Sequence, residues 1–243
     1  MTGRVHVVVG SPWREAVVRH LEPRSAHQPW PHVPDVREND SILVVFDTEP
    51  RLALTRLAHV GADRSVEAAI AALPREWLYT GAVALSRLDI DVAGRYALVD
   101  RASQMVSAVE AQRFDAPRED RFGHSSMAAA RVLLETDGRC TGCSSWLDLL
   151  SAVPAVRTVD SADDWPAVLC SACESAMRKG GFDTFLDYRF SLHPPCPRCD
   201  ARRSLRSQFG MPVAMFETVP WRLHQGCCVT PEQWTCSDCD HRW

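Results

Sequence analysis

Cysteines in the second half of this chain occur as pairs with two residues between the partners. A Cys-x-x-Cys pair forms a tight turn, or knuckle, that aims both sulfurs at one ion, and two knuckles complete the tetrahedral shell of Zn²⁺. Eight of the 10 cysteines follow this spacing. The sequence therefore predicts two structural zinc sites, built from Cys140, Cys143, Cys170, Cys173, Cys196, Cys199, Cys236 and Cys239.

Disulfides are the alternative for such pairs, and the predicted compartment argues against them. Residues 1–10 form a short apolar strand pattern that contains Arg4 and His6, which is not a signal peptide. No later stretch is apolar for long enough to cross a bilayer. We therefore expect a soluble cytoplasmic protein without a membrane partner, in a reducing compartment where thiolates stay available for metal. Four thiolates favour zinc over magnesium.

Composition sets limits on the fold and on the partners. With 243 residues and 46% apolar content, the chain can bury one large core or two to three small ones. All 10 cysteines follow residue 139, so the first half must fold by hydrophobic burial while metal binding contributes to folding of the second. The net charge of −4 gives no global sign of nucleic-acid binding, which would need a local basic patch.

Periodicity predicts mixed secondary structure in the first half. Apolar and β-branched runs predict strands at 3–9, 41–47, 79–85 and 96–99. Amphipathic spacing predicts helices at 66–73 and 102–112, and residues 51–60 fit either type. A proline-rich loop spans 23–34 and a polar linker spans 115–123. A helix over 124–135, capped by Ser125 or Ser126, then leads into the first knuckle.

The first two knuckles carry a resemblance to a nuclease family. The run Ala130-Arg-Val-Leu-Leu-Glu-Thr-Asp-Gly-Arg-Cys-Thr-Gly-Cys143, with Val168-Leu-Cys-Ser-Ala-Cys173, resembles the zinc-stapled HNH module of the treble-clef, ββα-metal class. The resemblance implies that these two knuckles share one structural zinc. In active members, a histidine on the intervening strand activates water while a divalent ion offsets phosphate charge.

The active-site positions depart from that pattern. The intervening strand reads Val156-Arg-Thr-Val-Asp-Ser161, with Ser161 where the histidine is expected, and Glu174 follows Cys173 where another histidine is usual. Asp160 and Glu174 remain the weak catalytic candidates, and they would require Mg²⁺ or Mn²⁺. The other interpretation is a treble clef that is kept for folding and contacts.

The last fifty residues resemble a bacterial zinc ribbon. The motifs are His193-Pro-Pro-Cys-Pro-Arg-Cys199 and Trp234-Thr-Cys-Ser-Asp-Cys-Asp-His-Arg-Trp243, and the resemblance implies one zinc between short antiparallel strands. Trp234 and Trp243 would cover that metal. We expect the two remaining cysteines, Cys227 and Cys228, to be buried thiols near the ribbon core.

Arginines gather beside the third knuckle. A ribbon strand could present them to phosphate oxygens, although a solvated arginine face explains them equally well. The nucleic-acid-binding candidates are Arg198, Arg202, Arg203 and Arg206.

The N-terminal part weakly resembles PUA-like barrels of the EVE and ASCH kind. The supporting residues are Gly10-Ser-Pro-Trp13, Trp30 and the turn Asn39-Asp40 ahead of a strand, where the family has Gly-Asp. Asparagine also enters left-handed turns, so the departure is tolerable. The resemblance implies an aromatic pocket for a flipped or modified base, whose candidates are Trp13, Trp30, Trp77 and Tyr79. Packing in the core is the alternative for these rings.

Together these features predict an α+β protein. We expect a mixed α/β domain or PUA-like barrel over 1–118, a treble-clef zinc module over 124–190 and a zinc ribbon over 191–243. We expect a bacterial protein that binds zinc and also binds nucleic acid, with modified DNA as its target. The alternatives are a modification-dependent restriction endonuclease with a rearranged active site, and a scaffold that binds a protein partner or a second copy of itself.

Overall fold

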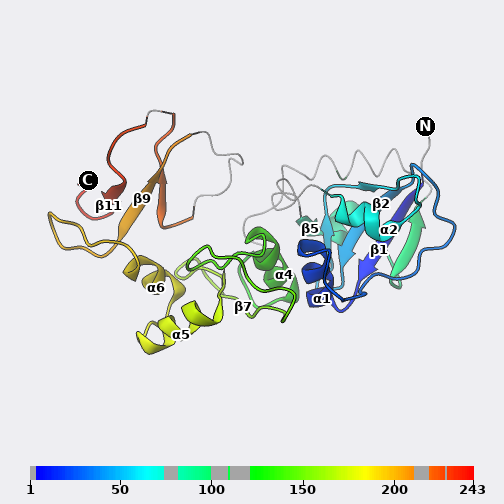
Figure 1. The fold of residues 1–243 in the computed structure, drawn as a ribbon, viewed down its shortest axis with the longest axis horizontal. Helices are drawn as coiled ribbons and strands as arrows, with labels where there is room; N and C mark the ends of the chain where they lie inside the picture. The colour runs from blue at the N-terminus through cyan, green and yellow to red at the C-terminus, as the bar shows by residue number, and fades with distance from the viewer. Residues whose placement is uncertain (1–3, 74–81, 100–108, 110–120, 211–218, 228) are drawn as a thin grey trace. The chain divides into compact units, whose positions relative to one another are not determined.

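The computed structural model describes residues 4–73, 82–99, 109, 121–210, 219–227 and 229–243 (Figure 1). The chain forms two compact units. The first consists of Met1–Ala162 with Pro166–Cys170, and the second of Asp163–Trp165 with Ser171–Trp243. The finer division into three ranges stays a prediction.

A mixed sheet forms the centre of the first unit. Its described strands lie in the order β5–β3–β2–β1–β6, with β4 paired to β2. Strands β1 and β2 are parallel and the other pairs are antiparallel. Because β5 and β6 are not paired to each other, this sheet is open, and the described strands close no barrel. The bounds are β1 Val5–Gly10, β2 Ser41–Phe46, β3 Leu52–Leu54, β4 Ala58–His59, β5 Ala82–Ala84 and β6 Tyr96–Val99.

Successive side chains of a strand point to opposite faces of the sheet, and in β1 and β2 both faces are covered by a core. Ile42 and Val44 face a core that also contains helix residues, whereas Leu43 and Val45 pack in a second core with Leu85. Every residue of β1 and β2 is buried. The helices whose bounds the structure describes in this unit are α1 Trp13–Leu21, α2 Val66–Ala71, the 3₁₀ helix Leu85–Leu88 and α4 Ser126–Glu135.

Along the chain, helix α1 follows β1 and precedes β2, so it belongs to the connection between these two parallel strands. A parallel pair needs a crossover connection, which the proline-rich loop alone does not supply. Helix α1 was not predicted from the sequence, although Ala16, Val17 and Leu21 give it an apolar face that is buried in the core.

Helix α4 was predicted, and it forms with Ser125 as its N-cap. The Ser125 side chain accepts a hydrogen bond from the backbone N–H of Ala128. Helix α4 shares the first core through residues such as Leu133. The part of the chain that leads into the first knuckle is therefore tied to the N-terminal sheet.

Most remaining predictions of secondary structure in the first unit are confirmed. The expected strands at 3–9, 41–47 and 96–99 and the helix at 66–73 all form, while residues 51–60 contain two short strands. The predicted strand at 79–85 forms over Ala82–Ala84. The predicted helix at 102–112 lies outside the described residues except for Val109, and the linker at 115–123 lies largely outside them.

A short hairpin belongs to the first unit, and the second unit has its own small sheet. The hairpin pairs β7 Val156–Arg157 with β8 Ala167–Val168. In the second unit the strand order is β10–β9–β11. Its elements are α5 Ser171–Lys179, α6 Phe185–Ser191, β9 Ser204–Gln208, β10 Arg222–His224 and β11 Trp234–Cys236.

Aromatic packing holds the second unit together. Phe185 on α6 is fully buried, and its ring lies 5.7 Å from that of Trp221 in an edge-to-face arrangement. Trp165 contacts the same indole at 5.8 Å. Such pairs contribute about 0.5–1.5 kcal/mol each beyond area burial.

Of the helices that the structure describes, none is both long and apolar enough to cross a membrane.

Candidate metal centres

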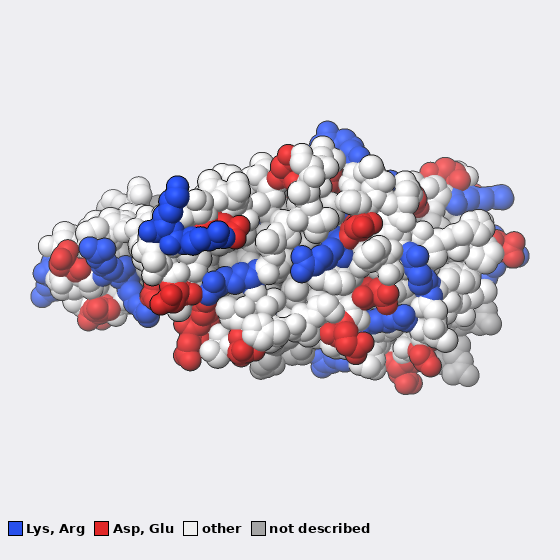
Figure 2. Space-filling view, turned by 90° about the horizontal axis from the view of Figure 1, so that it is seen from below, with Lys and Arg blue, Asp and Glu red and all other residues white. Residues whose placement is uncertain are grey.

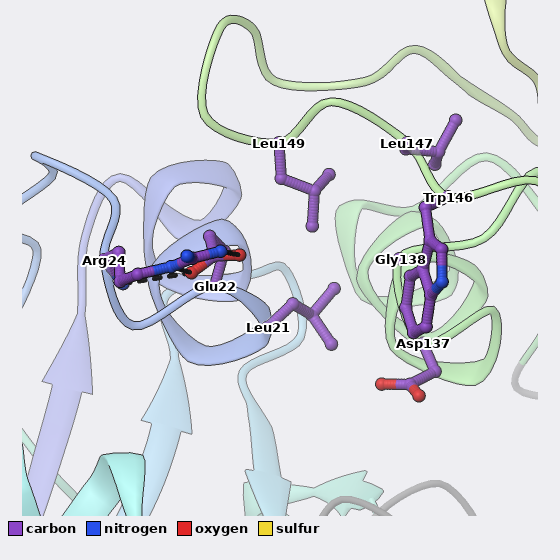
Figure 3. A pocket seen from close by; sticks show the side chains of 8 residues that line it. All are labelled: Leu21, Glu22, Arg24, Asp137, Gly138, Trp146, Leu147 and Leu149. Atoms are coloured by element: carbon purple, nitrogen blue, oxygen red, sulfur yellow. Dashed lines mark hydrogen bonds and ion pairs between the residues drawn. The ribbon is translucent and has the colours of Figure 1, made fainter.

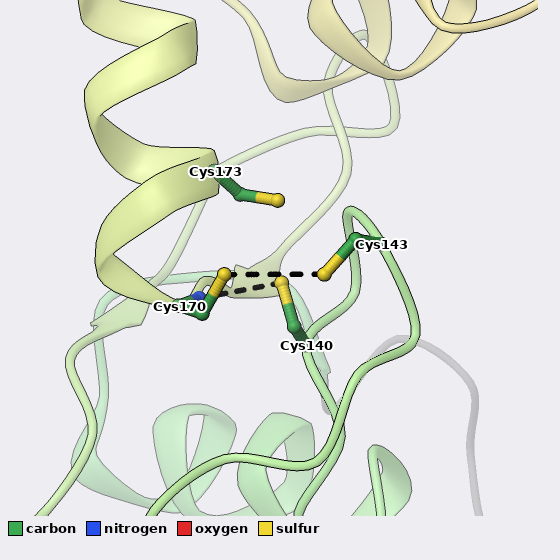
Figure 4. A group of neighbouring side chains, drawn as sticks. All are labelled: Cys140, Cys143, Cys170 and Cys173. Atoms are coloured by element: carbon green, nitrogen blue, oxygen red, sulfur yellow. Dashed lines mark hydrogen bonds between the residues drawn. The ribbon is translucent and has the colours of Figure 1, made fainter.

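The first two knuckles bring their four sulfurs together. Figure 4 shows Cys140 and Cys143 on one loop, Cys170 just ahead of α5, and Cys173 on the first turn of that helix. The Cys143 and Cys170 sulfurs are 3.9 Å apart. The backbone N–H of Cys170 donates to the Cys140 sulfur at 3.3 Å.

The hairpin fixes the first loop in place. The backbone N–H of Thr141 donates to the carbonyl of Val168, and the Thr141 hydroxyl accepts from the backbone N–H of Val168. These two bonds hold the loop of Cys140 beside the strand that leads to Cys170. The local fold, rather than the cysteines alone, therefore sets the sulfur geometry.

The third and fourth knuckles form a second cluster around β9 and β11. The Cys196 and Cys239 sulfurs are 3.7 Å apart, and those of Cys199 and Cys236 are 3.6 Å apart. Backbone N–H groups of Arg198 and Asp238 donate to the first sulfur of each knuckle at 3.4 Å.

These distances fit a metal better than disulfides. Within each cluster, all four sulfurs lie within 4.8 Å of one another. A tetrahedral Zn²⁺ with bonds of about 2.3 Å places its sulfurs about 3.8 Å apart. A disulfide needs about 2.05 Å, and the cysteines that the structure describes are free. Each cluster could therefore hold one zinc ion, which would cross-link its loops.

Burial and amide donors act in opposite directions on these thiols. Burial raises the pKa of the Cys140 thiol. Burial also acts against ionisation of Cys196, but amide donors from Arg198 and Cys199 together with the neighbouring sulfurs lower its pKa to about 7. Amide donors favour the thiolate, which is the form that binds zinc.

The two carboxylate candidates each have a partner. Asp160 accepts from His124, whose Nε2 lies 2.9 Å from the carboxylate, and Nδ1 of the same ring lies 2.9 Å from the Thr158 hydroxyl. Glu174 forms an exposed i,i+4 ion pair with Arg178 at 2.8 Å. Among the described residues, the metal-type clusters contain only the eight cysteines.

His124 is a residue that the sequence analysis missed as a partner of Asp160. The HNH resemblance places the expected histidine between the first two knuckles, whereas His124 precedes α4. The backbone N–H of Gly123 donates to the carbonyl of Val159 at 2.7 Å, which holds the His124 segment against the chain beyond β7. Only the tertiary fold could identify this pair.

The four candidate arginines are exposed but have different surroundings. Arg203 pairs with Asp187 at 3.3 Å and lies over the Phe190 ring. Arg206 lies in the middle of β9, while Arg198 and Arg202 flank the third knuckle.

Two of the aromatic candidates pack against the first core. Trp13 begins α1, and Trp30 lies 6.2 Å from the Phe46 ring; both are partly buried. Trp77 and Tyr79 lie outside the described residues. The turn at Asn39 has a φ of 68°, so asparagine does adopt the left-handed conformation expected there.

One expectation about the leftover cysteines is wrong. Cys227 was expected to be buried near the ribbon core, but its side chain is exposed. It follows Gly226, whose φ of 72° turns the chain directly after β10. The turn carries Cys227 into solvent, and Cys228 lies outside the described residues.

The first unit also contains a cavity with a volume of about 340 Å³ (Figure 3). Leu21, Leu147 and Leu149 line it, while Glu22 and Arg24 form an ion pair at its edge. Trp146 borders it with 60% of its surface exposed, beneath the guanidinium of Arg139 at 3.8 Å. The lining also carries the carboxylate of Asp137, and none of its residues belongs to a metal-type cluster.

Comparison with known proteins found no matching family model, curated protein or solved structure.

Proposed function

We propose that this chain is a zinc-binding protein whose C-terminal module binds nucleic acid. The observation that carries the proposal is the second cysteine cluster, which holds loops and strands rich in exposed arginines. Zinc would stabilise the small module outright, because a metal that binds only the folded state adds its binding free energy to folding. Arginines on a rigid frame suit phosphate recognition, since the guanidinium group is always charged and forms paired hydrogen bonds.

Charge on the rest of the molecule supports a local contact rather than a broad one. The net charge is −4. Figure 2 shows basic and acidic side chains interspersed over the face in view. Binding would therefore depend on a small number of phosphate contacts and would weaken as salt rises.

Recognition of a modified base remains a finer proposal. It would assign the pocket to the N-terminal domain, where Trp13 and Trp30 retain partial exposure. A preference for methylated over unmethylated DNA would support it, and equal affinity would contradict it.

The test is a salt-titrated binding assay on purified protein with its zinc quantified. Fluorescence anisotropy with methylated and unmethylated duplexes reports affinity. The proposal expects about two zinc ions per chain and binding at low salt that falls steeply with ionic strength. Full zinc content without binding at low salt would instead favour the scaffold alternative.

A second candidate, the endonuclease, is favoured by the contact between His124 and Asp160 at 2.9 Å. The Asp160 contact orients the imidazole, and Nδ1 would act as the general base toward a water that replaces its Thr158 hydroxyl partner. The test is nicking of supercoiled plasmid with Mg²⁺ or Mn²⁺. His124→Ala should abolish cleavage and Glu174→Gln separates the role of the other carboxylate. Equal nicking by wild type and His124→Ala would show contamination.

A further inference from the structure

One face of the small sheet in the second unit collects polar and aromatic side chains. Side chains of a strand alternate between faces, and register partners on neighbouring strands share a face. Arg206 in β9 is the register partner of Arg222 in β10 and of Trp234 in β11. These three side chains therefore form a row across the sheet, with Arg206 at its centre.

The opposite face of this sheet has a different chemistry. The Gln225 side chain donates to the hydroxyls of Ser207 and Thr235, whose positions alternate with those in the row. These polar groups satisfy one another, whereas the row places two arginines side by side. The charge of the sheet is thus concentrated on one face.

Arg206 and Arg222 are exposed, and neither forms an ion pair within the part of the chain that the structure describes. Like charges directly opposite each other on a sheet are destabilising. Arg222 does donate to the side-chain oxygen of Gln208 at 3.4 Å, which restrains its guanidinium. Arg203, in contrast, has Asp187 as a partner.

A third guanidinium lies near this pair. Arg189 on α6 lies over the Trp221 ring at 5.6 Å. Burial lowers the pKa of Arg189, and the nearby charges of Arg222 and Arg206 lower it further. Trp221 directly precedes Arg222, and its carbonyl accepts from the backbone N–H of Arg206, so Arg189 packs on the residue that adjoins the row. A bound anion would stabilise this concentration of positive charge.

Trp234 ends the row on its other side. Its ring lies 4.8 Å from His193, and Nδ1 of His193 is 2.6 Å from the carbonyl of Ser204. His193 is thereby fixed behind the indole. A flat aromatic next to guanidinium groups is suited to a sugar or base that follows a bound phosphate.

We propose that Arg206, Arg222 and Arg189, with Trp234 beside them, form the site that binds the phosphate backbone of nucleic acid. This inference rests on the proposed function and names its contact surface. Arg206 and Arg222 would contact phosphate oxygens directly. Arg189, on α6, would add to the positive electrostatic potential without touching the phosphate. We call this surface the arginine face.

The test uses the full zinc-loaded chain with a fluorescent single-stranded oligonucleotide and the duplex of the same sequence. Arg206→Gln and Arg222→Gln should each weaken binding about three- to tenfold at low salt. Each should also reduce the magnitude of the slope of log affinity against log salt concentration, the salt slope, by about one. The double variant should lose about two units of slope. Arg206→Lys, which keeps the charge, should retain the slope.

Arg178→Gln is the matched control, because Arg178 is an exposed arginine of the same unit that is already paired with Glu174. It should bind like wild type. Wild-type affinity in both glutamine variants of the arginine face, with weaker binding in Arg198→Gln or Arg202→Gln, would overturn this inference and leave the proposed function standing. If the wild-type protein binds neither oligonucleotide at low salt, the proposed function is contradicted as well.

A second measurement covers the case in which a glutamine variant loses zinc or unfolds. An arginine-selective dicarbonyl reagent modifies the wild-type protein with and without the oligonucleotide, and mass spectrometry locates the adducts. Binding should protect Arg206 and Arg222 but not Arg178. Equal modification of Arg206 and Arg222 in both states would overturn the arginine face.

Discussion

In the first unit, Nε2 of the fully buried His6 lies 2.9 Å from the carboxylate of Asp40. The same carboxylate accepts from Arg4 at 2.8 Å and from the backbone N–H of Arg37 at 2.9 Å. Nδ1 of His6 lies 3.1 Å from the hydroxyl of Tyr96 on the neighbouring strand. Asp40 therefore joins the turn before β2 to the centre of the sheet.

Asp40→Ala should destabilise the first unit by about 3 kcal/mol. The loss leaves Arg4 and His6 without their carboxylate, and breaking a buried ionic network is costly. Chemical denaturation followed by tryptophan fluorescence measures the change. Asp63→Ala, at an exposed carboxylate in a loop, is the control and should change stability little. A loss for Asp40→Ala as small as that of the control would contradict the network.

The stability that Asp40 contributes should depend on pH. Burial alone would raise the pKa of Asp40, but the hydrogen bonds from Arg4, His6 and the backbone hold it well below its usual range. A depressed pKa in the folded state stabilises the protein above the unfolded pKa, which is about 3.9. The stability difference between wild type and Asp40→Asn should therefore narrow as pH falls from about 5 toward 2. A difference that does not change over this interval would contradict the assignment.

Gly10→Ala should destabilise the first unit by about 1–3 kcal/mol through overpacking. A Cβ at Gly10 would lie 2.4 Å from the Trp30 ring and 2.6 Å from the Ala16 side chain. Thermal unfolding measures the loss. Gly94→Ala is the matched control, because nothing lies within 4 Å of its added Cβ. Equal melting temperatures for the two variants would mean that Trp30 does not pack on Gly10.

Removing one zinc ligand should affect the two clusters differently. Cys140→Ser should lower the zinc content from about two ions per chain to about one and should also destabilise the first unit. Leu149 and Val168, near this cluster in the chain, share a core with Val8 of the sheet. Cys236→Ser should lose the other zinc while the first unit melts as in wild type. Zinc content and calorimetry measure both effects.

Cys227→Ser controls for the loss of a thiol as such, since Cys227 is exposed and belongs to neither cluster. It should keep both zinc ions. Normal melting and full zinc content in Cys140→Ser or Cys236→Ser would contradict the two-site assignment.

Ser125→Ala should cost about 1 kcal/mol, because it leaves the N–H of Ala128 without its capping oxygen. Ser125→Asp should restore most of the loss, since aspartate is an equally good cap. Urea denaturation compares the three proteins. A full loss in Ser125→Asp would show that the hydroxyl has a role other than capping.

The sequence by itself determined the eight cysteines of the two candidate metal clusters and the two central strands, and it narrowed the cap of α4 to Ser125 or Ser126. Each depends on a local signal, namely the knuckle spacing, a run of apolar β-branched residues, or a serine ahead of an apolar helix. Helix α1 was not predicted, because its nine residues give only a short apolar pattern. Local spacing also gave the wrong environment for Cys227, which the turn after β10 exposes.

Only the tertiary structure decided which distant residues meet. His124 and Asp160 are 36 positions apart, and Arg189, Arg206 and Trp234 come from a helix and two strands. Such contacts depend on strand register and loop closure, which no single stretch of sequence specifies. Cysteine spacing therefore identifies the candidate metal ligands, while the fold around them places Arg206 beside Arg222.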